Sequence, residues 1–281
     1  MWICPACQQP LVLLEHQSSW QCENKHSYDV AKQGYVNLLL ANHKSSKSPG
    51  DSKLMINARN AFLGKGYYRP LVDALAAIVG EFIKSISPSP NSFNLFDAGC
   101  GEGYYLRQLN QSLKDGKFVV NYAGSDISKA AISLAARQSQ EGQYAVASNF
   151  NLPLADNSQQ VFLQIFTPVS EAQVHRVLSS EGLWLQVTPG AKHLQELKQQ
   201  LYDTPQEHQL DDKLADGFKL GFHREVNFKI HLEDFESREQ LLKMTPFYWV
   251  ADKQQIAAVL AELETLSVSF HIRGLRKSAM H

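Results

Sequence analysis

The clearest chemical pattern in the sequence is three glycines at alternate positions, Gly99, Gly101 and Gly103. They follow an apolar segment that ends at Asp97, and they precede a helix that we expect to begin at Tyr104. Glycine lets the backbone turn sharply and touch a ligand directly, because no Cβ blocks the approach. The spacing is tighter than the G-x-G-x-x-G of dinucleotide-binding loops, in which a helix N-terminus holds a pyrophosphate. The pattern predicts a ligand-binding loop, with a plain structural turn as the alternative.

A second acid, Asp126, supports the first interpretation. Residues 122–127 have the composition of the next strand, which places Asp126 at its carboxyl end, and residues 128–138 have the apolar spacing of a helix. In doubly wound sheets an acid at this position accepts hydrogen bonds from the two ribose hydroxyls of a nucleoside. The sequence therefore predicts a nucleoside ligand beside the glycine loop.

These segments together resemble the first motifs of class I S-adenosylmethionine-dependent methyltransferases. The resemblance implies that Asp97, Gly99 and Gly101 lie against a ligand that carries a sulfonium and no phosphate. A third expected strand, residues 143–147, ends just before Asn149, where these enzymes usually contact the adenine edge. A turn-forming role for Asn149 is the alternative, and the sequence leaves both open.

A separate cluster of cysteines lies near the N-terminus. Cys4 and Cys7 form a C-x2-C pair, and Cys22 and His26 form a second close pair after fourteen residues. Two such pairs joined by a hairpin-length segment are typical of a tetrahedral, structural zinc site. The alternatives are a redox C-x-x-C motif or incidental buried cysteines, but a redox motif would lie next to a β-α-β pattern. Cys100 belongs to the glycine loop and lies outside this site.

Composition and charge limit the class of protein. The 281 residues are 44% hydrophobic and carry a net charge of −1, as in an ordinary globular chain. No apolar run reaches the roughly 20 residues of a membrane span, and no secretory signal is visible, so we expect a cytoplasmic protein and no membrane partner. Residues 1–70 hold eight Lys/Arg against four acids, so the remainder carries −5. This excess of basic residues in the N-terminal part favours nucleic-acid binding. The alternative is that these charges only form the solvated surface of a small domain.

Motifs along nearly the whole chain resemble the family of 23S ribosomal RNA (guanine-N1)-methyltransferases. Besides the cysteine and histidine pairs, the matching segments are residues 31–39, 49–52, 58–59, 62–63, 97–105, 188–194 and 244–247. The resemblance implies that Tyr68, the Gly101–Glu102 pair and His193 bind S-adenosylmethionine. It also implies a homodimer whose zinc modules help to form a cleft for 23S rRNA.

Two segments near the expected active site depart from the family pattern. Residues 166–169 read Phe-Thr-Pro-Val where the family has Tyr-Ala-Pro-Cys, and residues 148–151 read Ser-Asn-Phe-Asn where it often has Ser-Ser-His-Arg. Guanine N1 lies on the Watson–Crick edge, so the target base must be unpaired or flipped. N1 also carries a proton that a base or water must accept. We assign no catalytic residue, because the resemblance commits Glu102 and His193 to the cofactor.

The expected fold class is α/β: a class I, Rossmann-like methyltransferase with a mostly parallel seven-stranded sheet, plus a small N-terminal zinc-binding module. Residues 244–251 and 266–274 are expected to form an antiparallel strand pair at one sheet edge, and residues 192–240 to form helices and loops. Helices are predicted from a cap at Asp51 or Ser52 through Phe62, and over residues 69–84.

Three parts are predicted along the chain: a zinc-binding RNA-recognition module (1–36), a linker with helices (37–94) and a methyltransferase domain (95–281). The predicted function is transfer of a methyl group from S-adenosylmethionine to N1 of a specific guanine in a hairpin of 23S rRNA. The alternatives are methylation of a small metabolite, and a catalytically silent RNA-binding or assembly protein.

Overall fold

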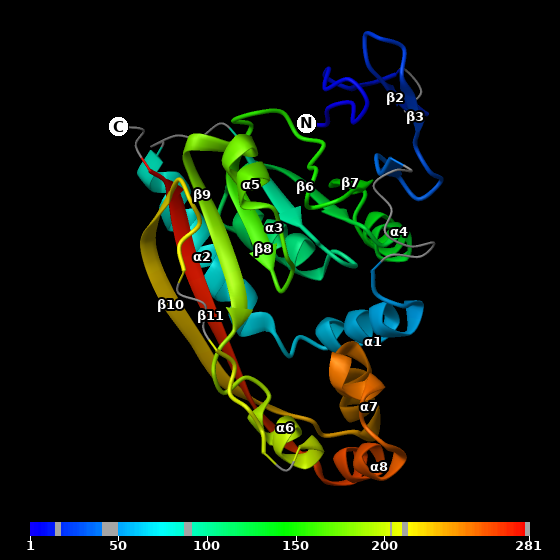
Figure 1. Cartoon of the computed structure of the whole chain (residues 1–281), viewed down its shortest axis with the longest axis vertical. Helices are drawn as coiled ribbons and strands as arrows, with labels where there is room; N and C mark the ends of the chain where they lie inside the picture. The colour runs from blue at the N-terminus through cyan, green and yellow to red at the C-terminus, as the bar shows by residue number, and fades with distance from the viewer. Residues whose placement is uncertain (15–17, 41–49, 87–91, 203, 210–212, 279–281) are drawn as a thin grey trace.

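A computed structural model describes residues 1–14, 18–40, 50–86, 92–202, 204–209 and 213–278. One large sheet forms its centre, with strand order β10-β11-β9-β8-β5-β6-β7-β4 (Figure 1). Its strands are β4 (Tyr35–Asn37), β5 (Phe93–Ala98), β6 (Val120–Asp126), β7 (Gln143–Val146), β8 (Gln159–Ile165), β9 (Leu178–Pro189), β10 (Phe218–His231) and β11 (Thr265–Lys277).

The six strands from β9 to β4 are parallel neighbours, and β10 and β11 add an antiparallel pair at one edge. From β5 the chain builds β6 and β7 on one side and then β8 and β9 on the other. The strand order therefore reverses beside β5. In open α/β sheets the ligand crevice lies at such a reversal, outside the carboxyl ends of the strands.

The predicted class of fold is confirmed, but the sheet has eight strands rather than seven. The additional strand is β4, a three-residue segment that pairs with β7. The prediction of a strand over residues 244–251 is wrong. Met244 ends helix α7 (Phe235–Met244), and residues 246–249 form the 3-10 helix η3 (Pro246–Trp249). Pro246 has no N–H to donate to a ladder, which disfavours a strand there.

The edge strand that pairs with β11 is β10, within the segment predicted to be helices and loops. Val226, Phe228 and Ile230 are more buried than the exposed residues between them. This alternation has the period of two that a half-buried strand requires. The period-two signal is confined to the second half of β10, because residues 219–221 are all exposed.

The helices agree better with the sequence patterns. Ser52 caps α1, where its hydroxyl accepts a hydrogen bond from Met55 N at 3.2 Å, and Ser128 caps α4 in the same way. The helices are α1 (Lys53–Gly64), α2 (Arg69–Ile86), α3 (Tyr104–Asp115), α4 (Lys129–Gln138), α5 (Glu171–Val177), α6 (Gln195–Leu201), α7 and α8 (Lys253–Glu262). Within the described ranges, none of them combines the length and apolarity that crossing a bilayer demands.

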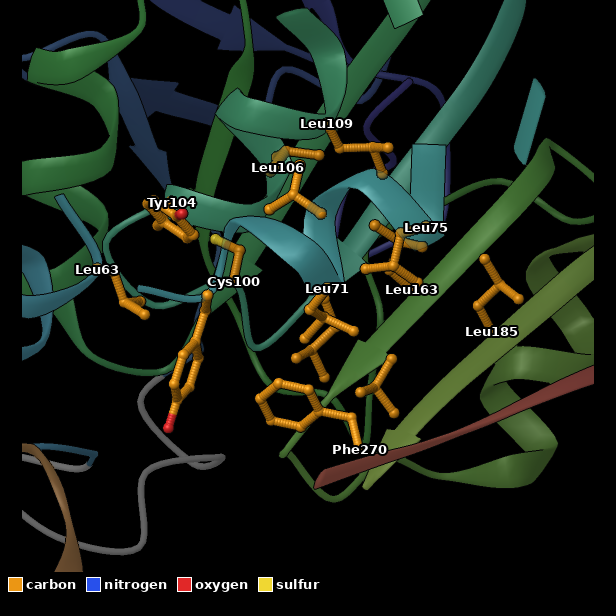
Figure 2. Close-up of a cluster of buried hydrophobic side chains, with 14 of the residues drawn as sticks. Leu63, Leu71, Leu75, Cys100, Tyr104, Leu106, Leu109, Leu163, Leu185 and Phe270 are labelled. Carbon is orange, nitrogen blue, oxygen red and sulfur yellow. The ribbon is translucent and has the colours of Figure 1, made fainter. Parts of the chain in front are cut away.

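Apolar side chains fill both faces of the sheet. On one face, leucines of α2 and α3 meet leucines of β8 and β9, as Figure 2 shows for Leu71, Leu106, Leu163 and Leu185. On the other face, the indole of Trp2 meets the ring of Phe96 edge-on at a centroid distance of 6.2 Å. The N-terminal segment is thereby packed onto the main sheet.

The N-terminal segment also forms its own three-stranded antiparallel sheet of β1 (Val12–Leu13), β2 (Ser19–Gln21) and β3 (Ser27–Asp29). In Figure 1 the β2–β3 hairpin stands at the periphery of the molecule. Ile3 N donates a hydrogen bond to Pro153 O at 2.9 Å. This backbone hydrogen bond and the packing of Trp2 together hold the N-terminal segment against the main domain.

Candidate functional site

A cavity of about 680 Å³ lies at the carboxyl ends of the central strands. All eight residues predicted to bind the cofactor line this one cavity, although they come from five separate parts of the chain. They are Tyr68, Asp97, Gly99, Gly101, Glu102, Asp126, Asn149 and His193. The fold thus brings together every predicted member of the site.

The glycine loop joins β5 to α3 and forms one wall of the cavity. Gly99, Gly101 and Gly103 have φ values of +68°, +56° and +81°, in the left-handed region that side-chain-bearing residues avoid. Gly99 also passes close to the loop after β8. A Cβ at Gly99 would lie 2.5 Å from Thr167 Oγ1. Both the left-handed backbone of Gly99 and the close approach of Thr167 therefore require glycine at this position.

Asp126 at the end of β6 connects the loop to the next strand. Its Oδ2 accepts a hydrogen bond from Gly101 N at 3.0 Å, and its Oδ1 accepts one from Ser128 N at 2.7 Å. An ionised carboxylate oxygen can accept more than one hydrogen bond. Asp126 therefore fixes the glycine loop while retaining acceptor capacity toward the cavity.

The cavity is acidic. Asp51, Asp97, Glu102 and Asp126 line it, and Arg59 is the single Lys or Arg among the described lining residues. Arg59 is paired with Asp51 at 2.6 Å. Burial, followed by the neighbouring carboxylates, raises the pKa of Asp97 well above its usual range. Burial also raises the pKa values of Glu102 and Asp126. A cationic ligand would offset these unfavourable charges.

Twelve buried side-chain polar atoms have no hydrogen-bond partner within the described structure. Four of them belong to predicted site residues, and they are Tyr68 Oη, Asp97 Oδ1, Glu102 Oε1 and Asn149 Oδ1. A buried polar atom without a partner costs about 1–3 kcal/mol. Their concentration on one cavity indicates a ligand that donates several hydrogen bonds.

His193 lies between β9 and α6 and is buried. Burial, followed by the influence of His208, lowers the pKa of His193 to about 3, so its ring is neutral at ordinary pH. Its Nδ1 accepts a hydrogen bond from Ser269 N at 3.3 Å, which assigns the ring proton to Nε2. Nε2–H is then available as a donor.

Asn149 follows β7 and lies beside the loop after β8. Its Nδ2 donates to Thr167 Oγ1 at 3.2 Å and to Pro168 O at 3.1 Å. Asn149 thus lies in the short turn between Ser148 and Asn151 and also lines the cavity, so the geometry accommodates both sequence interpretations.

Sequence reasoning did not assign roles to other residues that line the cavity. Asp51, Arg59 and Phe247 belong to segments that carried the family resemblance, so a signal for them existed. Tyr105, in the first turn of α3, also belongs to such a segment. His208 lies in a segment without any recognisable pattern, and only the fold brings it to the cavity.

The four predicted metal ligands also converge. The ligand atoms of Cys4, Cys7, Cys22 and His26 all lie within 4.8 Å of one another. Cys7 Sγ and Cys22 Sγ are 3.7 Å apart, and His26 Nδ1 is 3.6 Å from Cys4 Sγ and 3.5 Å from Cys22 Sγ. Tetrahedral zinc with bonds of about 2.3 Å to sulfur and 2.0–2.1 Å to nitrogen requires edges of roughly 3.8 and 3.6 Å. The donor set therefore fits zinc, and with four protein ligands the site is structural.

The hydroxyl of Tyr28 lies 3.2 Å from Cys4 Sγ. A donor at this position stabilises a thiolate ligand and orients it. The side chain comes from β3, so the β2–β3 hairpin, whose turn carries Cys22 and His26, also supports the site.

Fold and site together define a class I methyltransferase with an N-terminal zinc ribbon. Two family profiles agree with this class: "RlmA, N-terminal" matches residues 2–47, and "Methyltransferase domain" matches residues 96–185. A methyltransferase domain of this class uses S-adenosylmethionine, which carries hydrogen-bond donors on its ammonium, ribose hydroxyls and adenine amine. Its positive charge suits the acidic lining.

Whole-length relatives identify the family. The 23S rRNA (guanine(748)-N(1))-methyltransferase of Streptomyces fradiae is 32% identical over 96% of this chain and 95% of its own length. The Bacillus subtilis protein YxjB, named "Putative 23S rRNA (guanine-N(1)-)-methyltransferase", is 30% identical over 97% of this chain and 95% of its own length. Among solved structures, YcgJ of Bacillus subtilis covers 71% of this chain and 98% of its own at 15% identity, with a TM-score of 0.46. The chain belongs to the family of 23S rRNA (guanine-N1)-methyltransferases.

Proposed function

We propose that this protein transfers the methyl group of S-adenosylmethionine to N1 of a guanine in 23S rRNA. The observation that carries the proposal is that one cavity is lined both by acidic side chains, which suit the methyl donor, and by apolar and aromatic side chains. The aromatic and apolar side chains that line this cavity include Phe150, Phe166, Pro246 and Phe247. Such a lining suits a planar, uncharged nucleobase.

The cofactor roles follow from the lining residues. Asp126 accepts hydrogen bonds from the ribose hydroxyls, and Asn149 contacts the adenine. The backbone of Gly99 and Gly101 lies directly against the cofactor. The remaining predicted residues, Tyr68, Asp97, Glu102 and His193, hold its methionine part. The unpartnered oxygens of Tyr68, Asp97 and Glu102 support this assignment.

Bound S-adenosylmethionine supplies an electrophilic methyl group on a sulfonium. Transfer of this methyl to N1 would release the demethylated cofactor as a thioether, and the N1 proton would be lost from the base. The protein's residues mainly align the two reactants and exclude water. We assign no side chain to accept the proton.

The N-terminal zinc module is proposed to bind RNA. Lys25 and Lys32 are exposed on it, and the hairpin it carries lies at the periphery of the molecule. We propose residues 1–36 as this module, 37–94 as a linker with helices and 95–281 as the methyltransferase domain. Strand β4 crosses the boundary between the module and the linker and is part of the main sheet. A homodimer that joins two such modules around the RNA is part of the proposal.

We infer that the protein works in the cytoplasm. Its proposed substrate is ribosomal RNA, and its metal ligands must stay reduced to bind zinc as thiolates.

The test is methylation of unmodified 23S rRNA transcript with tritiated S-adenosylmethionine, with primer extension to map the product. A methyl on N1 blocks base pairing, so reverse transcription stops one nucleotide before the modified guanine. Asp126→Ala is the paired negative control. Methyl transfer to small acceptors only would favour the metabolite enzyme, and cofactor binding without transfer to any acceptor would favour the silent assembly protein.

A further inference from the structure

Phe166 is an exposed aromatic residue at the centre of the molecule. It directly follows β8, one of the central strands, and it lines the cavity with 43% of its surface exposed. A large apolar side chain at the carboxyl end of a central strand is ordinarily covered. Its exposure toward the cavity leaves room for a further apolar group there.

The backbone of Phe166 is strained. Its φ is +55°, which places a bulky residue in the left-handed region that glycine normally occupies. Such outliers cost about 1–3 kcal/mol and persist only where surrounding structure holds them. Here Phe166 N donates to Val187 O at 3.1 Å, and Gln164 Nε2 donates to Thr167 O at 2.8 Å. The loop after β8 is therefore fixed in a conformation that presents the ring.

Three buried or half-buried rings support Phe166. Its ring centroid lies 5.5 Å from Phe270, 6.4 Å from His193 and 6.4 Å from Tyr105. Phe270 belongs to β11 and also appears in the apolar cluster of Figure 2. The ring is thus supported from inside the protein while part of it stays uncovered.

The sheet register places Phe166 across the glycine loop from the proposed ribose ligand. Ala98 of β5 pairs with Ser125 of β6 on one side and with Gln164 of β8 on the other. Asp126, the proposed ribose ligand, therefore lies on the opposite side of the glycine loop from Phe166. If Asp126 holds the nucleoside, the rest of the cofactor would extend across the loop toward β8.

We propose that Phe166 is the platform on which the target guanine stacks while N1 faces the methyl group. This inference rests on the proposed function and names the residue that positions its substrate. Stacking suits a flipped base, because one face of the purine must be covered after the base leaves its helix. The strained backbone is explained if it aims the ring at the acceptor position.

The test is a double-mutant cycle between the ring and the base, run after the methylated guanine has been mapped. Synthetic hairpins contain either that guanine or an abasic nucleotide at its position. Binding is measured by fluorescence anisotropy with S-adenosylhomocysteine present, so that no transfer occurs. The variants are Phe166→Ala, Phe166→Trp and, as a matched exposed phenylalanine that does not line the cavity, Phe235→Ala.

We expect Phe166→Ala to weaken binding of the guanine hairpin by roughly 5- to 150-fold, the range for loss of one base–aromatic stack. Binding of the abasic hairpin should not change, and Phe166→Trp should retain wild-type binding of both. Affinity for S-adenosylhomocysteine should be the same in all variants, which also reports that they are folded.

Equal losses on both hairpins, or no loss on either, would overturn the stacking role. Failure of the wild type to methylate any 23S rRNA guanine is a different result. It would overturn the proposed function, and the stacking role of Phe166, which rests on that function, would be overturned as well.

Discussion

Replacement of Gly99 by alanine tests whether the glycine loop and the loop after β8 are built against each other. Gly99 has a φ of +68°, and an added Cβ would lie 2.5 Å from Thr167 Oγ1 and 2.8 Å from Thr167 Cβ. Rotation of the threonine side chain cannot relieve the second contact, because Cβ does not move with χ1. The backbone of one loop must therefore shift.

The cost can be worked from these contacts. The left-handed backbone costs an alanine about 1–2 kcal/mol. Displacement of Thr167 also weakens its hydrogen bonds with Asn149 and Gln164, at 3.2 and 2.8 Å. Each such bond contributes about 0.5–1.5 kcal/mol net. The free energy of unfolding should therefore fall by about 2–5 kcal/mol.

Gly66→Ala is the matched control. Gly66 has a φ of +82°, but no atom lies within 4 Å of an added Cβ. Its substitution should cost only the backbone contribution of about 1–2 kcal/mol. Urea unfolding of both variants gives the difference, and calorimetric titration with S-adenosylmethionine should show weaker binding for Gly99→Ala alone. Equal destabilisation of the two variants, with unchanged cofactor affinity, would refute the reasoning.

Three further predictions concern the metal, the buried acid and the buried hydroxyl. The purified protein should contain one zinc ion per chain by elemental analysis. Cys22→Ser should lower both the zinc content and the melting temperature. A zinc-free protein that is fully stable would contradict the structural role of the metal. Because the pKa of Asp97 is raised above its usual 3.8, the folded protein holds a proton that the unfolded chain has lost, so the free energy of unfolding should decrease as pH rises above about 4. Asp97→Asn should reduce this pH dependence in urea titrations and weaken cofactor binding, and an unchanged slope would contradict the assignment. Tyr68→Phe removes a buried hydroxyl without a protein partner, so stability should stay equal or rise while affinity for S-adenosylmethionine falls about 3- to 10-fold; a loss of stability with unaltered affinity would show that the hydroxyl faces no ligand.

The parts of the fold that sequence predicted well carry strong local signals. Glycines with positive φ, an acid at the end of a strand and serine caps each depend on backbone conformation within a few residues. They placed β5, β6 and β7 and the helices α1 to α4 correctly. The cysteine and histidine spacing likewise predicted the metal site, because the ligands themselves determine the local chain geometry.

The errors lie where local composition and tertiary context disagree. The aromatic segment after Met244 has strand-like composition, yet Pro246 and the packing of α7 give a 3-10 turn. Half of β10 lacks any alternation, because an edge strand with exposed residues on both faces has no burial pattern to impose. The strain at Phe166 arises from contacts between distant segments, so no sequence pattern indicated it.

The most direct test of the central claim is mass spectrometry of 23S rRNA from cells with and without this gene. We expect one guanine to lose a single methyl group in the deletion strain. The methyl should return with the wild-type gene and not with Asp126→Ala. A methylation map that is identical in all strains would contradict the assignment of 23S rRNA as the substrate.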